Sequence, residues 1–321
     1  MKKNNKLVIL LIFIILILFI FLYYLNKNTY ELYTENTKKN YAICIWGQLR
    51  GIESTHDSFN NYLVKPLNAD VYVVARNIID DNDETIINIF NEDAVKYKKL
   101  NNAPDISSYF TKNNGENALN EYEYITENWK NEGNINHYIN FNEVAKLIGN
   151  ELHSNYDYII MVRSDFLYLF DFPNILDIIP ENLNDHFWCY SGHSYGGINY
   201  NLIVVPKKYL IEYLTACYKY IMDGTLHNIV KIPVLNSESY MQLIFNNNNW
   251  KVGYIQNNGF ISANNSNDLT TWGKIIYSEE HNVLYKYREQ LDNSYNALEL
   301  WNNNKRWKYK LVNDESHILL E

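Results

Sequence analysis

Cysteine is scarce in this sequence, and its positions indicate no shared cysteine chemistry. The 3 cysteines, Cys44, Cys189 and Cys217, lie far apart without a C-x-x-C spacing. This pattern indicates neither a zinc site nor a disulfide framework. Cys44 lies within an apolar run, so we expect it to be a buried core residue.

Clusters of positive charge are absent as well. Lysine and arginine together number 28 against 37 acidic residues, which gives a formal net charge of −9, and no long Lys/Arg run occurs. A nucleic-acid partner requires clustered cations, because these displace the counterions of the phosphate backbone. We therefore expect no nucleic-acid partner.

The common glycine motifs for phosphate binding are missing too. Neither G-x-x-x-x-G-K-[ST] nor G-x-G-x-x-G occurs in the chain, which has 12 glycines. The sequence thus contains neither a P-loop nor a dinucleotide fingerprint. A sulfotransferase or a methyltransferase is disfavoured for the same reason.

One long hydrophobic run is present near the N-terminus. Residues 7–25 read LVILLIFIILILFIFLYYL, without a charge, a glycine or a proline. A helix of that length rises about 29 Å, which is enough to cross the hydrocarbon core of a bilayer. The alternatives are a cleaved signal peptide and a buried core helix, but no small-x-small cleavage site follows the run.

The charges around this run favour one orientation. Lys2, Lys3 and Lys6 precede it without an acidic residue, whereas charges of both signs follow it. The positive-inside rule therefore predicts a single-pass type II protein with a cytoplasmic N-terminus and a lumenal or external domain. We expect a cytoplasmic tail at 1–6, a transmembrane signal anchor at 7–25, a stem at 26–40 and one folded domain at 41–321.

The folded domain begins with a strand, a helix and a second strand. Two short apolar runs, 41–46 and 70–75, are typical of buried strands. Between them, residues 52–67 have apolar side chains at helical spacing. This order predicts a β-α-β unit with a parallel sheet and a right-handed crossover.

Further elements follow along the chain. Residues 135–152 have the apolar spacing of an amphipathic helix, and residues 156–162 form a buried-strand pattern. We also predict a strand at 166–170, a glycine-rich turn at 191–197, an apolar segment at 198–205, a helix led by Pro206, a helix at 237–245 and a strand at 251–255. Loops are expected at 80–84 and 101–120, and only loose helical pieces after residue 261. Together these elements predict an α/β domain whose mostly parallel sheet is flanked by helices.

Two polar segments directly follow predicted strands, where the ligand crevice of an open parallel sheet lies. Residues 47–51 offer the amide of Gln48 and the guanidinium of Arg50, which suits phosphate. Residues 163–165 carry Asp165, whose burial would be costly unless a cation met it, and a divalent ion carrying a diphosphate would do so. The residues alone also allow a plain tight turn at 47–51 and a simple Arg163–Asp165 ion pair.

Five segments along the chain together resemble a known family. They are IWGQLR at 45–50, NADVYV at 68–73, YDYIIMVRSD at 156–165, GGIN at 196–199 and SESY at 237–240. In this order they resemble a family of GT-A-like glycosyltransferases that occurs in bacterial polysaccharide clusters, giant viruses and algae. The resemblance covers residues 41–256 and implies a GT-A-like, Rossmann-type fold, a nucleotide-sugar donor, a divalent metal (Mn²⁺ or Mg²⁺) and a membrane-anchored catalytic domain.

The resemblance also implies roles for single residues. Asp165 matches the last carboxylate of the family's metal-binding D-x-D motif, which bridges the metal to the donor diphosphate. Arg163 replaces the first Asp, and it can itself neutralise phosphate and leave a weaker metal site or none. Gln48 and Arg50 are expected at the nucleotide. Asp70 is expected near the same rim, or alternatively only at the approach to the second strand.

Glu238 is the candidate on the acceptor side. In an inverting transfer, a carboxylate there takes the proton of the incoming hydroxyl. An equally good interpretation is helix capping, because Glu238 follows Asn236 and Ser237. Tyr200 stands where the family often has Asp, so one acceptor-side contact is changed. The aromatic candidates for stacking on a sugar ring are Trp188, Tyr190, Tyr195 and Tyr200.

These observations favour a membrane-anchored glycosyltransferase that moves a sugar from a nucleotide-sugar donor to a hydroxyl of a glycan or glycoprotein. Residues 7–25 would hold it in the bilayer of a Golgi or ER-type, viral or host membrane. The alternative is a catalytically inactive, membrane-tethered protein that binds a nucleotide sugar or a glycan, which the broken D-x-D motif and Tyr200 favour. Neither the sugar nor the acceptor is identified by the sequence.

Overall fold

The first strand, helix and second strand fold as their apolar patterns predict. β1 (Tyr41–Gly47) is buried at every position, and it pairs in parallel with β2 (Asp70–Asn77). The connecting helix is continuous through α2 (Ile52–Phe59), η1 (Asn60–Val64) and α3 (Lys65–Leu67). It ends at Asn68, whose backbone takes the left-handed conformation with a φ of 46°.

These elements belong to the described part of the chain in this computed structural model. The described residues are 40–77, 95–102, 105–122, 133–192, 196–229, 236–265, 269–270, 273–304, 307 and 309–311. The chain divides into two units, 1–39 and 40–321, and all described residues belong to the second. No helix within these ranges has both the length and the apolar character needed to cross a bilayer. The predicted tail, anchor and nearly all of the stem lie outside the described residues.

Eight strands of the described residues form one sheet, in the order β14-β8-β6-β7-β4-β1-β2-β3. The strands not yet given are β3 (Val95–Asn102), β4 (Tyr158–Val162), β6 (Phe187–Tyr190), β7 (Leu202–Pro206), β8 (Val252–Ile255) and β14 (Tyr309–Leu311). β1 is parallel to β2 and β4, and β2 is parallel to β3. β7 runs antiparallel to both of its neighbours, and β14 runs antiparallel to β8. The sheet is therefore mostly parallel, as predicted, but mixed.

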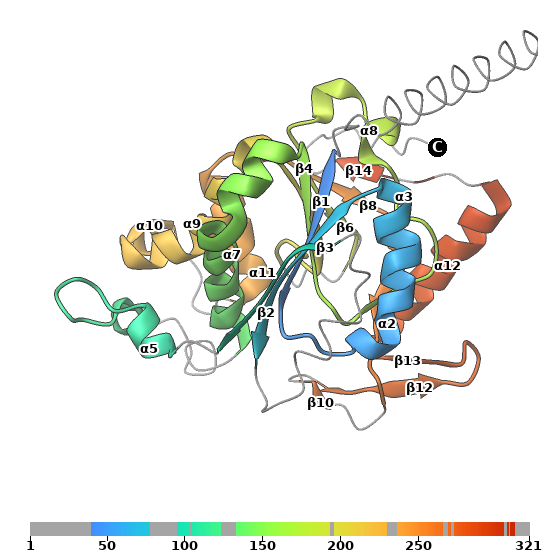
Figure 1. Ribbon diagram of the computed structural model, residues 1–321, viewed down its shortest axis with the longest axis horizontal. Coiled ribbons are helices and arrows are strands. Elements are labelled where there is room, and N and C mark those ends of the chain that lie inside the picture. Colours follow the sequence, from blue (N-terminus) through green and yellow to red (C-terminus); the bar gives the residue numbers. More distant parts are fainter. Residues whose placement is uncertain are drawn as a thin grey trace, which may run out of the picture. The chain divides into compact units, whose positions relative to one another are not determined.

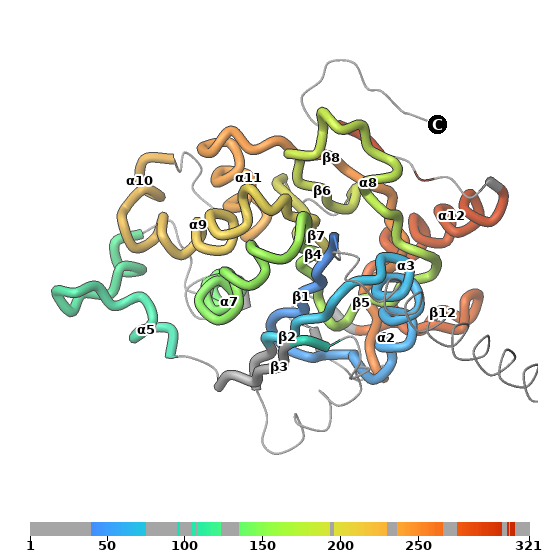
Figure 2. The backbone as a smooth tube through the Cα atoms, turned by 45° about the horizontal axis from the view of Figure 1, so that its top comes forward, coloured from blue at the N-terminus to red at the C-terminus, as the bar shows by residue number. Residues whose placement is uncertain are grey.

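Helices cover both faces of this sheet, as predicted. One core contains the side chains of Ala42, Cys44 and Trp46 from β1, packed with α7 (Gly133–Asn155), α9 (Leu210–Met222) and α11 (Ser237–Asn247). The core on the other face contains the alternate residues of β1 and the apolar side of α2. Figures 1 and 2 show α7, α9 and α11 on one side of β1, and α2, α3 and α12 (Arg288–Asn304) on the other. Cys44 is fully buried, which confirms its expected place in the core.

Smaller elements complete the described structure. β5 (Phe166–Tyr168) pairs with β9 (Gly259–Ile261) outside the main sheet. Two short hairpins are formed by β10 (Leu269–Thr270) with β11 (Gly273–Lys274), and by β12 (Ile276–Ser278) with β13 (Val283–Tyr285). The short helices are α5 (Ile106–Tyr109), η2 (Ala118–Glu121), α8 (Ile175–Ile178), η3 (Glu181–Leu183), η4 (Lys207–Tyr209) and α10 (Thr225–Ile229).

Some expectations from the sequence were wrong. The segment 101–120 is not a flexible insert, because it begins in β3 and then buries Phe110 and Leu119 in the core. The helix α12 occupies a region where only loose helical pieces were expected. The loop expected at 80–84 lies outside the described residues.

Candidate functional site

The order of the strands places a switch point between β1 and β4. From β1 the chain proceeds to β2 and β3 on one side, and it then returns to place β4 on the other side of β1. In open α/β sheets, ligands bind outside the carboxyl ends of the strands at such a point. The loops that follow these two strands are 48–51 and 163–165, which are the segments singled out in the sequence.

The two loops are joined by direct hydrogen bonds. The Ser164 hydroxyl lies 2.8 Å from the carbonyl oxygen of Gln48 and 2.9 Å from that of Arg50, and it donates to both in a shared bond. The Thr55 hydroxyl of α2 donates to the Ser164 carbonyl oxygen at 2.6 Å. These bonds hold the backbone of both loops in one arrangement.

Gly51 allows the two loops to approach this closely. Its φ is +64°, a conformation that favours glycine. A Cβ atom at this position would lie 3.2 Å from the Cβ of Asp165 and 3.4 Å from the backbone oxygen of Ser262. The glycine that ends the GQLRG segment is thus required by the packing of the site.

Arg163 and Asp165 form a buried, two-pronged ion pair. Arg163 Nε donates to Asp165 Oδ1 at 2.8 Å, and Arg163 Nη2 donates to Oδ2 at 2.6 Å. Burial alone would raise the pKa of the Asp165 carboxyl, but the charge and hydrogen bonds of Arg163, together with the charges of Arg50 and Lys286, outweigh burial and lower the pKa. Asp165 is 5% exposed, so the pair is largely desolvated. The ion pair that the residues alone allowed is confirmed.

Two further cations surround this pair. Arg50 Nη2 lies 3.8 Å from Asp165 Oδ2, and the Arg50 side chain is 44% exposed. Lys286 lies between β13 and α12, and its backbone N–H donates to the Ile261 carbonyl oxygen at 3.0 Å. Burial lowers the pKa of Lys286 to about 8, with further lowering by the charges of Arg163 and Arg50. Lys286 was not predicted, because it lies far from Asp165 in the sequence and belongs to no motif.

Ser262 brings Lys286 to the ion pair. The backbone N–H of Ser262 donates to the Asp165 carbonyl oxygen at 2.9 Å. Its hydroxyl donates to the Leu284 carbonyl oxygen at 2.8 Å. Ser262, which directly follows β9, therefore connects the loop after β4 to the segment that carries Lys286.

The loop before β7 supplies the other side of the site. Because β7 is antiparallel, its amino end lies at the edge where β1 and β4 end. Asn201 Oδ1 lies 3.4 Å from Arg163 Nη1. Tyr200 is buried, and its hydroxyl is 2.8 Å from His137 Nδ1 on α7. His137 is a second residue of this site that the sequence did not reveal.

Glu238 lies in the first turn of α11, next to this loop. The backbone N–H of Ile198 donates to the Glu238 carbonyl oxygen at 3.0 Å. A Cβ on Gly197 would lie 1.9 Å from that same oxygen, so the loop packs against α11 without room for a side chain. This close approach brings the GGIN and SESY segments together.

The Glu238 carboxyl is not the cap of its helix. Asn236 and Ser239 form a reciprocal capping box at the start of α11. Burial raises the pKa of Glu238, although a hydrogen bond from its own backbone N–H and the charge of Arg163 counteract this rise. Glu238 is thus an acidic residue of the first turn, as the helix-capping interpretation expected, although Asn236 and Ser239 supply the capping box itself.

Other predicted positions lie elsewhere. Asp70 is the first residue of β2 and pairs with Ala42, so it lies at the opposite edge of the sheet from Arg50. There it accepts a hydrogen bond of 2.7 Å from the Tyr156 hydroxyl, and Lys96 Nζ lies 4.0 Å from it. The expectation that Asp70 lies at the nucleotide rim was wrong. Asp70 is the first residue of a parallel strand, so it lies at the edge of the sheet opposite to the carboxyl ends of the strands.

Three of the aromatic side chains predicted to stack on a sugar are buried. Trp188 and Tyr190 belong to β6 and are fully buried, and Tyr200 is buried beside His137. None of these three rings is open for stacking on a sugar. Tyr195 lies outside the described residues.

The side chains around Asp165 do not fit a divalent metal ion. Both carboxylate oxygens of Asp165 already accept hydrogen bonds from Arg163. Within the described ranges, no group of three or more His, Cys, Asp and Glu side chains is placed to share an ion. Magnesium and manganese prefer oxygen ligands, whereas the neighbours here are two guanidiniums and an ammonium. The structure gives Asp165 a different role, which is to hold Arg163.

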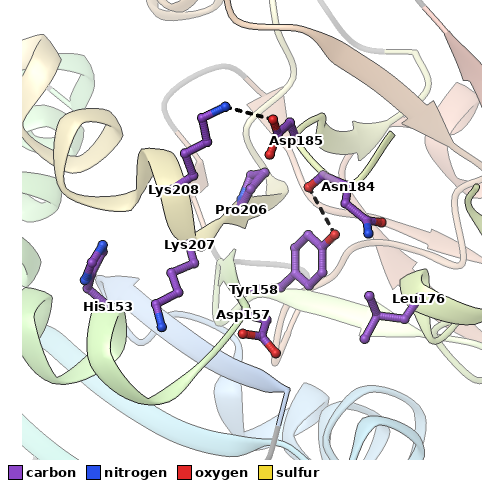
Figure 3. Close-up of a pocket in the computed structure, with 9 residues that line it drawn as sticks. All are labelled: His153, Asp157, Tyr158, Leu176, Asn184, Asp185, Pro206, Lys207 and Lys208. Carbon is purple, nitrogen blue, oxygen red and sulfur yellow. Dashed lines mark hydrogen bonds and ion pairs between the residues drawn. The ribbon is translucent and has the colours of Figure 1, made fainter. Parts of the chain in front are cut away.

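A pocket of about 520 Å³ lies at the other edge of the sheet. It lies beside Tyr158, the first residue of β4, and beside Pro206, the last residue of β7 (Figure 3). Lys208 is paired there with Asp185 at 2.8 Å, and the Tyr158 hydroxyl donates to the Asn184 carbonyl oxygen. None of the predicted site residues lines this pocket.

Comparison with known proteins finds similarity in backbone arrangement only. The sequence matches no protein-family model and no curated protein. Mouse xyloside xylosyltransferase 1 is similar with a TM-score of 0.40 and 6% identity, over 64% of this chain and 81% of that one. The mannosyltransferase Ktr4p from S. cerevisiae is similar with a TM-score of 0.39 and 11% identity, over 65% of each chain. The glycosyltransferase GlyE of Streptococcus pneumoniae TIGR4 has a TM-score of 0.37 and 11% identity, over 66% of this chain and 44% of that one.

Proposed function

We propose that this protein is a glycosyltransferase that moves a sugar from a nucleotide-sugar donor to a hydroxyl of a glycan or glycoprotein. The observation that carries the proposal is the cationic site at the β1–β4 switch point, with Arg50 and Arg163 on one side and Glu238 nearby. The ordered segments that resemble GT-A-like glycosyltransferases support the same function, because four of the five contribute to this site.

The proposed transfer requires that the departing nucleoside diphosphate be stabilised. In the transfer, the bond between the anomeric carbon and the donor phosphate oxygen breaks, and the acceptor oxygen forms a new bond to that carbon. The nucleoside diphosphate leaves with the bonding electrons and gains negative charge. Arg163 is suited to stabilise that charge, because a fixed cation in a partly desolvated site acts without reorganisation. Arg50 adds a second, more exposed cation beside it. The hydrogen bonds of Ser164 keep both loops in place for this role.

Glu238 is the proposed base for the acceptor. Its carboxylate would take the proton of the incoming hydroxyl as the bond to the sugar forms, as in an inverting transfer. Partial burial raises its pKa, which makes the carboxylate a better proton acceptor than an exposed one. The Asp that the family often has on this side is Tyr200 here, so Glu238 is the carboxylate left near the loop.

We further propose that residues 7–25 span a membrane, with a cytoplasmic tail at 1–6 and a stem up to residue 40. The catalytic unit would then face the lumen or the exterior of a Golgi or ER-type, viral or host membrane. The support for this is the uncharged apolar run and the three lysines before it.

Donor turnover by the purified full chain tests the proposed function. UDP-, GDP- and CMP-sugars are screened for hydrolysis and transfer, and the wild type is compared with Glu238→Gln. We expect one donor to be turned over, and Glu238→Gln to lower the rate of transfer by about 100-fold or more, which is typical for loss of a general base. Binding of the donor should change little, because Glu238 lies on the acceptor side.

Glu212→Gln is the matched control, since Glu212 is an exposed residue of α9. It should leave the rate unchanged. Donor binding without turnover, even with acceptors supplied, would favour the alternative of an inactive binding protein. Failure to bind any nucleotide sugar would overturn both readings.

A further inference from the structure

Two arginine side chains and the segment that carries Lys286 come together at one carboxylate, that of Asp165. Arg50 follows β1, Arg163 follows β4, and Lys286 follows β13. Arg163 pairs directly with Asp165, Arg50 lies 3.8 Å from the same carboxylate, and Ser262 ties the Lys286 segment to the backbone of Asp165. The hydrogen bonds among these segments fix the arrangement in the protein as it stands.

The positive charge of this cluster exceeds its negative charge. Arg163 and Asp165 neutralise each other, so three cations less one carboxylate leave an excess of two positive charges from Arg50 and Lys286. Burial lowers the pKa of Arg50 and that of Lys286, the charge of Asp165 counteracts this in both, and the charge of Arg163 lowers both further. The cations therefore repel one another, and an anion placed among them would relieve the repulsion.

The cluster matches a ligand with two negative charges close together. A diphosphate carries such charges, and guanidinium groups bind phosphate oxygens with two parallel hydrogen bonds while an ammonium acts as a compact point charge. Arg50 has the exposure to turn toward such a ligand, and the half-buried Lys286 lies over the ring of Tyr287, with Nζ 4.8 Å from its centre. The first turn of α2 begins beside the same loop, where the helix dipole also favours an anion.

We infer that Arg50, Arg163 and Lys286 together bind the diphosphate of the donor directly, without a divalent metal ion. This inference rests on the proposed function and adds to it the third cation and the absence of a metal requirement. Asp165 acts as the residue that orients Arg163. During transfer the cluster would hold the leaving nucleoside diphosphate, which is the task a metal performs where carboxylates are available.

Titration calorimetry of the full chain with UDP, GDP and CMP tests this inference. The dissociation constants are measured in EDTA and again in Mn²⁺, for the wild type, Lys286→Met, Lys286→Arg and the control Lys219→Met. Lys219 is an exposed lysine on α9, a helix that contributes no residue to the cluster. Thermal melting shows that each variant is folded.

We expect a nucleoside diphosphate to bind equally well in EDTA and in Mn²⁺, and inorganic pyrophosphate to displace it. Lys286→Met should weaken binding by about 10- to 100-fold, the usual effect of removing one hydrogen bond between charged groups. Lys286→Arg should restore most of the affinity, and Lys219→Met should bind like the wild type. CMP, which has a single phosphate, should bind more weakly than either diphosphate.

The outcomes separate this inference from the proposed function. Binding that is lost in EDTA and returns with Mn²⁺ would overturn the inference while leaving the proposed function intact. Unchanged affinity in a folded Lys286→Met variant would overturn the role of Lys286. Metal-free binding of a diphosphate without turnover of any sugar donor would support the inference and count against the proposed function, and no binding of any nucleotide would overturn both.

Discussion

Arg163 decides the character of the site at the level of single residues. In the resemblance to GT-A-like glycosyltransferases it stands at the first Asp of D-x-D, and its side chain forms an ion pair with Asp165. With both oxygens of Asp165 engaged by Arg163, the proposed chemistry is left to the cations and to Glu238. An arginine at this position therefore gives this edge of the sheet a positive charge.

His137 shows how these cations affect a neighbouring residue. Burial lowers the pKa of His137 to about 3, and the charges of Arg163 and Arg50 add to the lowering. The folded protein thus keeps His137 neutral at pH values where the unfolded chain, with an ordinary pKa of about 6.5, binds a proton. The free energy of unfolding must then fall as the pH is lowered from about 6.5 toward 3.

This dependence is measurable by urea unfolding at several pH values between 4.5 and 7.5, roughly the window in which an ordinary histidine takes up its proton. Well below pH 6.5, His137 should contribute a slope of about 1.4 kcal/mol per pH unit, the value for one proton. His137→Gln should lack this part of the slope. His153→Gln, which makes the same change at an exposed position of α7, should keep it, and equal slopes in all three proteins would contradict a neutral buried His137.

Some site residues were predictable from the sequence, and others were not. Arg50, Arg163 and Asp165 each follow an apolar run that reads as a buried strand, so their common edge could be inferred from the parallel order. Asp70 opens its strand, so the same parallel order places it at the opposite edge, and only the family resemblance had put it near the nucleotide. Lys286 and His137 come from a segment after β13 and from a helix, and only the tertiary fold brings them to Asp165.

Among the elements, the packing of β6 against β8 illustrates a position where glycine is required by space. Gly253 of β8 lies opposite Trp188 of β6, and a Cβ there would lie 2.1 Å from the indole ring. Gly149 of α7 offers a contrast, because its Cβ would meet only the flexible end of Ile211 at 2.8 Å. A methyl group would therefore clash with a rigid ring at Gly253, but only with a side chain that can move at Gly149.

We expect Gly253→Ala to destabilise the protein by about 1–3 kcal/mol, the usual cost of overpacking a core. Gly149→Ala should be close to neutral or slightly stabilising, since alanine is favoured over glycine within a helix by about 1 kcal/mol. Urea unfolding of both variants gives the comparison. A Gly253→Ala variant as stable as the wild type would show that β6 and β8 can move apart at little cost.

The elements that the sequence predicted share a strong apolar pattern. The strands at 41–46 and 70–75, the helices at 52–67 and 135–152 and the strand at 251–255 are present with small shifts of their ends. The missed elements give a weaker signal: β6 is apolar but has only four residues, β3 has polar and charged residues at most positions, and α12 carries few large apolar side chains. Their conformation is determined by neighbours in the sheet and by packing on β9, which a single sequence does not display.

At the scale of the whole molecule, the antiparallel β7 was not foreseen. The apolar segment 198–205 gave no sign of its direction, because buried parallel and antiparallel strands have similar compositions. Its direction matters for the site, since it is the loop before β7 that contributes Tyr200 and Asn201. The overall α/β class follows from periodicity, whereas the mixed sheet does not.

The proposed membrane anchor gives a prediction for the whole chain. We expect the full chain, expressed in cells, to stay with the membrane fraction after extraction at alkaline pH, because a span of 19 apolar residues is held by hydrophobic burial and not by charge. Replacing Ile12 and Ile15 by Asp should release it, while Asp at two exposed positions, Asn150 and Ser154 of α7, should not. Extraction of the wild type at alkaline pH would contradict an anchor.

The pairing of β1 with β4 also determines when the site can form during synthesis of the chain. Ser164 and Gln48 are 116 residues apart in the chain, and Lys286 comes later still. A ribosome releases the chain from its N-terminus, and β1 and β2 can meet early, but β4 must be made before the two loops join. The cations then gather in the order of their synthesis, and a nascent chain carries no complete diphosphate site until Lys286 has emerged.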